Sequence, residues 1–193
     1  AKNYFNWIKD WWRSQGVYLE EKRLKSEVSF PKKLKENLEP LSLAEIQLIV
    51  SNADQKRKAL YLTLVCSGKR ISELLYLRMM DVDFESSPAR FKIRAGNTKS
   101  RQEHEGYFST EALAAVKRIT KDKSDEDFVF HNRKLPYDPK AQIFQRCWTI
   151  NEMKYFSTLR KRVGFNDKYI TGRSTKTIHN FRSFFFTWAS LEN

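Results

Sequence analysis

The apolar run ALYLTLVC, residues 59–66, is followed almost at once by a glycine and a permanently charged arginine. Such a run predicts a buried helix, and Gly68 interrupts it. Apolar side chains recur at helical spacing from Ile71 onward, which predicts a second helix packed on the same core. Arg70 thus stands where the chain leaves a buried helix, and a partly buried guanidinium needs hydrogen-bonding partners. Glu73, on the same helical face, can hold one side of Arg70 and leave the other side for an anion.

The plainer interpretation of this pair is an exposed surface ion pair, worth roughly a few tenths of a kcal/mol. The apolar residues on both sides of Arg70 and Glu73 argue against a casual surface contact. The segment therefore predicts a helix start that presents positive charge beside the core.

A capping box, formed by Ser42 and Glu45, opens an expected helix over residues 42–53. The apolar residues that mark its buried face are Leu43, Ile46, Ile49 and Val50. Further helices are expected over residues 55–66, 109–120, 151–164 and 177–193, with a loop entering a short strand at 123–130.

Phe91 and Ile93 alternate with basic residues, and the chain then turns at Gly96 and Asn97 before returning through residues 106–108. This pattern is typical of a β-hairpin with a basic tip. Together with the helices, it predicts an α+β domain that is mainly α, with a small antiparallel sheet.

The N-terminal part differs from the rest. Residues 4–15 carry aromatic side chains at helical spacing, and residues 20–40 are charged and punctuated by Pro31 and Pro40. This composition predicts an aromatic helix followed by a basic linker, so we divide the chain into residues 1–40 and a domain at 41–193.

The net charge of +13 favours a polyanionic partner, most commonly nucleic acid, although such a charge also serves solubility. The only cysteines, Cys66 and Cys147, offer no disulfide framework and no Cys/His metal cluster. The sequence shows neither an apolar run long enough for a membrane helix nor a secretory signal. We therefore expect an intracellular protein, in the cytoplasm or nucleoid or in a host cell.

The expected last helix contains His179 and Arg182 on one face, among many aromatic residues, and a helix this apolar is expected to be buried. Taken alone, this pair is explained by a core histidine and an arginine whose charged end reaches solvent. Lys99, at the tip of the hairpin, is by itself a solvated lysine. The order of these residues after Arg70 and Glu73 is more informative than any one of them.

This order resembles the tyrosine recombinase (phage integrase) family over about residues 40–190. The family's first box, T-G-x-R-x-S-E-L-x-x-L-x-x-x-D-I, is similar to SGKRISELLYLRMMDV, with Ser67 in place of threonine. Its second box, H-x-L-R-H-T-F-A-T, is similar to HNFRSFFFT, with Ser183 where many members have histidine. The hairpin lysine of the family falls on Lys99, and its rivals are Lys92, Arg94 and Arg101.

The resemblance implies a DNA strand transferase that forms a 3′-phosphotyrosine intermediate. Arg70 and Arg182 would clamp the scissile phosphate, and Glu73 would orient Arg70. Lys99 would protonate the leaving 5′-oxygen, and His179 would accept the tyrosine proton or stabilise the phosphate. No cofactor and no metal are implied. Further basic residues expected to contact backbone phosphates are Lys69, Arg101, Lys154, Arg160, Arg173 and Lys176.

The resemblance also implies double-stranded DNA as partner, a homotetramer on two DNA sites, and residues 1–40 as the last helix of a core-binding domain plus its linker. No tyrosine follows Arg182 in the sequence, although the family places its nucleophile there. We therefore expect this chain to be a fragment, monomeric and unable to cleave DNA alone.

Three alternatives to a recombinase remain open: a non-catalytic DNA-binding module of the same fold, a type IB topoisomerase, and a metal-dependent nuclease. The nuclease would use Asp81, Asp83 and Glu85 to bind magnesium, whereas the simpler interpretation is that these carboxylates cap the turn before Phe91.

Overall fold

The computed structural model describes residues 7, 10–16, 40–98, 100–131, 142–166, 168 and 174–191, with side chains of the helix that starts at Gln142 described from residue 148. The chain divides into two compact units, residues 1–37 and 38–193. In the first unit, residues 10–14 are helical, and Trp7, Trp11 and Trp12 are exposed. The rings of Trp11 and Trp12 pack edge-on against each other, with centroids 5.5 Å apart.

The second unit begins with the predicted capping box. Helix α3, Leu43–Ser51, starts at Ser42, whose hydroxyl accepts from the Glu45 amide while the Glu45 carboxylate accepts from the Ser42 amide. Ile46, Ile49 and Val50 are buried as predicted. Leu43 was predicted to share this face but is half exposed, whereas Leu41, just before the helix, is buried in the core.

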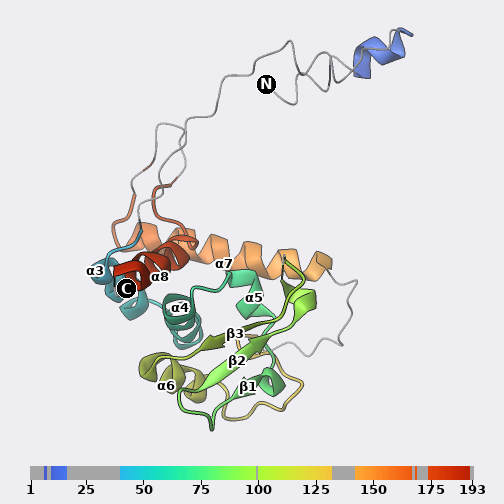
Figure 1. Cartoon of the computed structure of the whole chain (residues 1–193). Coiled ribbons are helices and arrows are strands. Elements are labelled where there is room, and N and C mark those ends of the chain that lie inside the picture. The colour runs from blue at the N-terminus through green and yellow to red at the C-terminus, as the bar shows by residue number, and fades with distance from the viewer. Residues whose placement is uncertain are drawn as a thin grey trace. The chain divides into compact units, whose positions relative to one another are not determined.

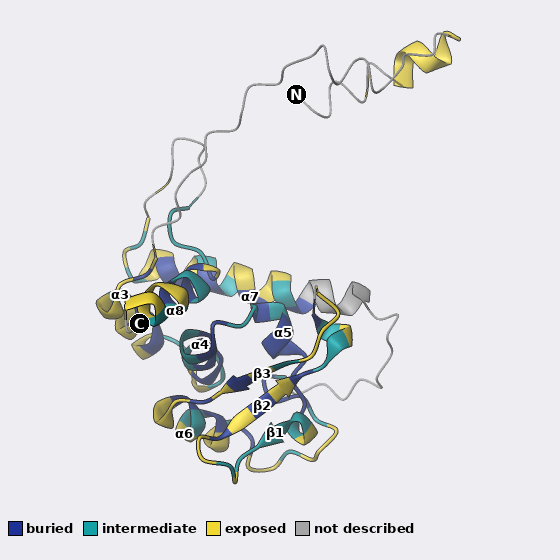
Figure 2. Ribbon diagram, viewed as in Figure 1, coloured by how far each residue is buried: buried dark blue, intermediate teal, exposed yellow. Residues whose placement is uncertain are grey.

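Helix α4, Gln55–Ser67, is the centre of the unit and packs against α3, α6 and α8 (Figure 1). Ala59, Tyr61 and Thr63 on it are completely buried. The helix ends at Gly68, as predicted. Helix α5, Ile71–Leu75, follows after a short turn and is buried along almost its whole length, as the dark ribbon in Figure 2 shows.

Helix α5 is much shorter than the sequence pattern predicts. After Leu75 the chain pairs with a distant segment: the Val129 amide donates to the Leu77 carbonyl, and Arg78 forms an antiparallel bridge with Phe128. An ion pair between the buried Arg78 and the exposed Glu126 adds to this contact. These long-range bonds replace the next helical turn, so the helix that was expected to continue from Ile71 ends at Leu75.

The sheet is antiparallel and has the order β1–β2–β3 in the described part of the chain. Strands β2, Arg90–Ile93, and β3, His104–Tyr107, form the predicted hairpin, with Phe91 opposite Gly106. A Cβ at Gly106 would overlap the Phe91 ring, so the glycine makes room for that side chain. A short 3-10 turn, η2, Ala95–Asn97, lies at the tip. Strand β1, Val82–Asp83, follows the 3-10 turn η1, Met79–Asp81, and was not predicted.

Helix α6, Thr110–Ile119, starts at Ser109 and covers α4 with its Ala112 and Val116 side. Residues 123–130 were predicted to be a loop entering a short strand; the loop is present, and the strand is reduced to a single bridge at Phe128. The reason is the ammonium of Lys123, which donates to the carbonyls of Phe128, Val129 and His131. The segment curls around this group and cannot extend.

Two helices complete the unit. Helix α7, Gln142–Arg162, begins well before the predicted start at residue 151 and ends before Gly164, as expected. Helix α8, Asn180–Leu191, was predicted to be buried, but only its inner side is. Phe181 and Phe184 contact the core, whereas Phe186 and Trp188 are about half exposed. Figure 2 shows the exposed parts of α8 in yellow.

Candidate phosphate-binding site

The site is built on the turn between α4 and α5. Gly68 has φ 58°, a left-handed conformation that glycine adopts without strain, and its amide donates to the Leu64 carbonyl to end α4. A Cβ at this position would overlap the Phe185 ring of α8. The glycine therefore permits both the sharp turn and the close approach of α8.

Arg70 stands directly after this turn, at the start of α5. The Glu73 carboxylate accepts from Nη1 of Arg70 at 2.8 Å and from the backbone amide of Arg70 at 2.8 Å. The Glu73 side chain is 3% exposed and the Arg70 side chain 43% exposed. Glu73 thus holds both the backbone amide and the guanidinium of Arg70. The rest of the guanidinium stays accessible, as the sequence predicts.

Arg182 reaches the same turn from α8. Its Nη1 donates to the Gly68 carbonyl at 2.6 Å, across 114 residues of sequence. Burial and the neighbouring Arg70 guanidinium lower the pKa of Arg182, while Glu73 acts in the opposite direction. The two guanidinium groups are therefore close enough to repel each other, and the fold holds these two like charges side by side.

The two arginines line one pocket of about 320 Å³ between the α4–α5 turn, strand β3 and helix α8. Its cationic residues are Lys69, Arg70 and Arg182, and its anionic ones Glu73 and Glu105. Since Glu73 is bonded to Arg70, the pocket keeps a small excess of positive charge. Preorganised guanidinium groups with free N–H donors are suited to bind a phosphate.

Lys69 belongs to this pocket. Burial lowers its pKa, Glu73 acts against this effect, and Arg182 adds to it. The ammonium therefore releases its proton more readily than a surface lysine does. Cys66 also lines the pocket, and burial raises the pKa of its thiol, so the thiol stays neutral.

Strand β3 contributes residues that the sequence analysis did not select. His104, Glu105 and Tyr107 line the pocket, and Nε2 of His104 lies 3.1 Å from the Ser100 hydroxyl. The only sequence signal was their position in the returning strand of a hairpin with a basic tip. That signal placed the strand but did not reveal which end of it meets the α4–α5 turn.

His179 is not among the residues that line the pocket. It is exposed, and its backbone carbonyl accepts from the amides of Arg182 and Ser183 at the start of α8. The predicted catalytic role of its imidazole stays a prediction. Lys99 and Arg173 lie outside the described residues.

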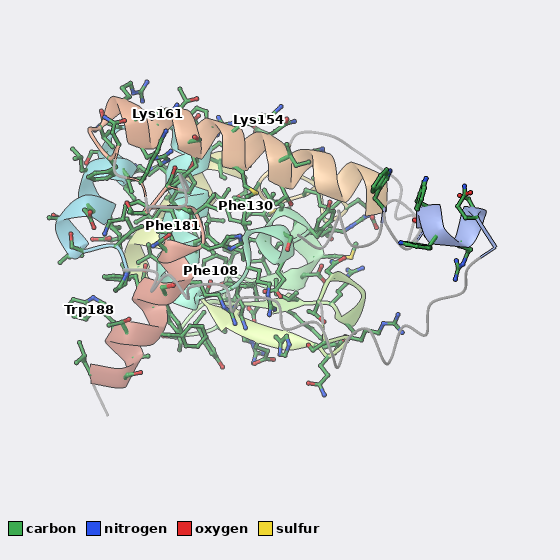
Figure 3. The ribbon with its side chains drawn as sticks, turned by 90° about the horizontal axis from the view of Figure 1, so that it is seen from above. Phe108, Phe130, Lys154, Lys161, Phe181 and Trp188 are labelled. Atoms are coloured by element: carbon green, nitrogen blue, oxygen red, sulfur yellow. The ribbon has the colours of Figure 1, made fainter. Side chains whose placement is uncertain are left out.

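The other predicted DNA contacts have different environments. Lys154 and Arg101 are exposed, and Figure 3 shows Lys154 projecting from the outer side of α7. Lys176 pairs with Glu45 and donates to the Pro40 carbonyl. Arg160 is 5% exposed and donates to the Phe165 carbonyl, so its geometry points to a structural role at the end of α7 and away from a phosphate contact.

The acidic residues considered for a nuclease are engaged elsewhere. The Asp81 carboxylate accepts from Arg94 at 2.8 Å, and the Asp83 carboxylate accepts from the amides of Glu85 and Ser86. The bonds of Asp83 cap the turn before β2, whereas Asp81 binds an arginine that follows β2. In the part of the chain that the structure describes, no cluster of three His, Cys, Asp or Glu residues suits a metal ion.

The sequence profile of the phage integrase family matches residues 39–189. The chain belongs to the phage integrase family. The match covers most of the chain and includes both segments that form the pocket. Comparison with the curated proteins found no significant match.

Solved structures of tyrosine recombinases share the fold of this family member. The XerA recombinase has a TM-score of 0.58 and 19% identity, over 96% of this chain and 58% of its own. The Tn1549 transposon integrase, in complex with circular intermediate DNA, has a TM-score of 0.58 and 19% identity, over 84% and 56%. The lambda integrase tetramer bound to a Holliday junction has a TM-score of 0.60 and 14% identity, over 92% and 50%.

This integrase-family chain thus spans a little more than half the length of the first two proteins and half of the third. The match confirms the predicted fold, which is mainly helical with a small antiparallel sheet. None of the described helices has the length and apolar character of a membrane span.

Proposed function

We propose that the pocket binds the scissile phosphate of DNA, and that the chain is the phosphate-activating part of a site-specific tyrosine recombinase. The observation that supports this most is the convergence of Arg70 and Arg182 on one pocket, each held by a separate bond. Membership of the phage integrase family adds the reaction class.

In the proposed reaction, the phenolate oxygen of a tyrosine attacks the phosphorus, a P–O bond to the tyrosine forms, and the bond to the 5′-oxygen breaks. Negative charge gathers on the non-bridging oxygens, and Arg70 and Arg182 stabilise it through charge-assisted hydrogen bonds. Glu73 keeps Arg70 in place during this change. Because the bond to tyrosine retains the energy of the phosphodiester, religation requires only the reverse attack by a 5′-hydroxyl.

The proton transfers are assigned by resemblance to the family. Lys99 gives a proton to the leaving 5′-oxygen, and His179 takes the proton of the tyrosine or bonds the phosphate. The nucleophilic tyrosine is not assigned to any of the 193 residues, since none follows Arg182. The proposal needs no metal or cofactor, because the arginines supply the positive charge.

We further propose duplex DNA as the substrate and four copies as the working assembly inside the cell. The support is the net charge of +13 and the family membership, together with the described tetramer of lambda integrase on a Holliday junction. Residues 1–40 would then be the last helix of a core-binding domain and its linker. Lys69, Arg101, Lys154, Arg173 and Lys176 are the proposed contacts to the DNA backbone.

The phosphate site is tested by titrating the ¹⁵N-labelled chain with inorganic phosphate and following the Nε–H signals of Arg70 and Arg182. We expect both signals to move with one dissociation constant. Arg70→Gln and Arg182→Gln should each weaken binding by about tenfold or more, since a hydrogen bond to a charged group is worth about 1.5–3 kcal/mol. Arg118→Gln, an exposed arginine on α6, serves as the control and should leave the affinity unchanged.

If phosphate moves neither signal, or if the two pocket variants bind phosphate as the control does, the pocket is not a phosphate site. A second experiment tests DNA cleavage, with a longer form of the protein that contains these residues and the nucleophilic tyrosine. A covalent protein–DNA adduct should form, and Arg182→Gln should abolish it.

A further inference from the structure

The two arginines of the pocket are held by groups of different charge. Arg70 is bonded to the carboxylate of Glu73, so its positive charge is largely compensated. Arg182 is bonded to the carbonyl of Gly68, which is neutral. Among the described residues, no carboxylate is paired with Arg182, so its charge remains available to an anion.

A single hydrogen bond to a carbonyl does not fix the plane of a guanidinium, which can rotate about that bond. Phe186 supplies the missing constraint. The Cζ atom of Arg182 lies 4.9 Å from the centroid of the Phe186 ring, within the range of a cation–π contact. The carbonyl thus holds one edge of the group, and the ring holds one face.

The position of Phe186 on α8 accounts for this contact. It follows Arg182 by one helical turn, and long side chains in a helix lean toward the N-terminus, so its ring covers Arg182. The ring also packs edge-on against Phe185, with centroids 5.5 Å apart, and Phe185 in turn lies against Gly68. The turn that contains Gly68 therefore supports the Phe186 ring through Phe185, and its carbonyl binds Arg182 directly.

Phe186 is half exposed, although it lines a polar pocket. In the pattern of the second box its place is that of an alanine, which has no ring to offer. An exposed phenylalanine has no benefit for folding here comparable with that of the buried Phe181 and Phe184. Its contribution lies in what it does to the charged group that it covers.

We propose that Phe186 is a positioning residue for Arg182, which orients the guanidinium so that its free N–H edge faces the phosphate. This inference rests on the proposed function of the pocket as a phosphate site. Without the ring, Arg182 keeps its charge and its bond to Gly68 but samples several planes, and each phosphate bond then requires it to be ordered again.

The test is a double-mutant cycle in the same phosphate titration, with the 193-residue chain. Phe186→Leu should weaken inorganic phosphate binding about three- to fivefold, which corresponds to the loss of a partly exposed cation–π contact. Phe186→Tyr keeps a ring and should restore the affinity of the original chain. Trp188→Leu removes another exposed aromatic residue of α8 and should have no effect.

The cycle is completed with Arg182→Gln. In that background Phe186→Leu should cause no further loss, because the ring then has no guanidinium to orient. Urea unfolding of each variant reports any general destabilisation separately.

The outcomes separate the two hypotheses. If Arg182→Gln weakens phosphate binding but Phe186→Leu does not, the phosphate site stands and the positioning role is wrong. The role is equally wrong if Phe186→Leu acts with the same strength in both backgrounds. If Arg182→Gln itself has no effect, the proposed function fails and the positioning role fails with it.

Discussion

At the scale of single residues, Gly68 has three separate structural roles in the site. Its left-handed conformation ends α4, its carbonyl binds Arg182, and its missing side chain admits Phe185. The sequence pattern indicated this glycine only as an interruption between two helices. A backbone carbonyl has no signature in a sequence, so the partner of Arg182 was not predictable from residue types.

Gly68→Ala should therefore damage both stability and binding. The left-handed conformation alone costs a non-glycine residue about 1–2 kcal/mol, and the added methyl group must also displace the Phe185 ring. We expect a loss of about 2–4 kcal/mol in the free energy of unfolding, measured with urea, together with weaker phosphate binding.

Gly164→Ala is the matched control for this change. Gly164 also has a positive φ, 97°, but a Cβ there would meet nothing within 4 Å. The Gly164→Ala variant should be destabilised only by the strain of its backbone conformation, and it should bind phosphate normally. Equal effects of the two substitutions on phosphate binding would show that the contact between Gly68 and α8 has no role in the site.

At the scale of elements, α5 shows where prediction from sequence succeeded and where it did not. The pairing of Arg70 with Glu73 was predicted because the two residues are three apart, a spacing that a helix start brings together. The end of α5 was not predicted, because it is set by hydrogen bonds to residues 125–129, far along the chain. Hydrophobic spacing alone cannot show that a distant segment competes for the same backbone groups.

The role of Glu73 within α5 gives a second prediction. Its carboxylate is buried and bonded twice to Arg70, so Glu73→Gln should leave a guanidinium without its counter-charge. We expect the free energy of unfolding to fall by about 1–3 kcal/mol, and the α5 amides to exchange their hydrogens faster.

Glu103→Gln is the control for Glu73→Gln. Glu103 pairs with Lys92 at the surface, with both side chains about half exposed, and such a pair contributes only about 0.2–1 kcal/mol. A loss in Glu73→Gln no larger than in this control would contradict the view that Glu73 organises the start of α5.

Helix α8 illustrates a different limit of the sequence. Its many aromatic residues predicted a buried helix, yet the structure buries Phe181 and Phe184 and leaves Phe186 and Trp188 half exposed. The sequence shows how much apolar surface a helix has, but it does not show how much of that surface other elements will cover. The role assigned to Phe186 depends on that difference.

At the scale of the whole molecule, His131 links separate parts of the second unit. Its ring stacks on Trp148 of α7, with centroids 4.3 Å apart, while Lys56 and Arg57 of α4 and Lys123 lie close enough to repel a proton. Burial, followed by these cations, lowers the pKa of His131 to about 3. The folded protein therefore needs this imidazole to be neutral.

This requirement predicts a pH dependence of stability. Between about pH 6.5 and pH 3 the unfolded chain binds a proton at His131 and the folded chain does not, so acidification favours unfolding. His131→Phe keeps a ring for Trp148 but does not titrate. Between pH 7 and pH 4.5 the original chain should lose about 1–2 kcal/mol more than the variant, a value reduced for the partial exposure of the ring.

Urea unfolding of both proteins at the two pH values measures this difference, and the contribution of all other groups cancels in the comparison. Parallel pH profiles for the two proteins would mean that His131 is already neutral when the chain is unfolded or is protonated in the folded state.

The order of synthesis gives the contact between Gly68 and Arg182 a further meaning. The two residues are 114 positions apart, and a chain leaves the ribosome from its N-terminus. A nascent chain that has not yet produced α8 already contains Arg70, Glu73 and the sheet, but one wall of its pocket does not exist. The proposed phosphate pocket can therefore be completed only after α8 has been translated and has packed against the turn that contains Gly68.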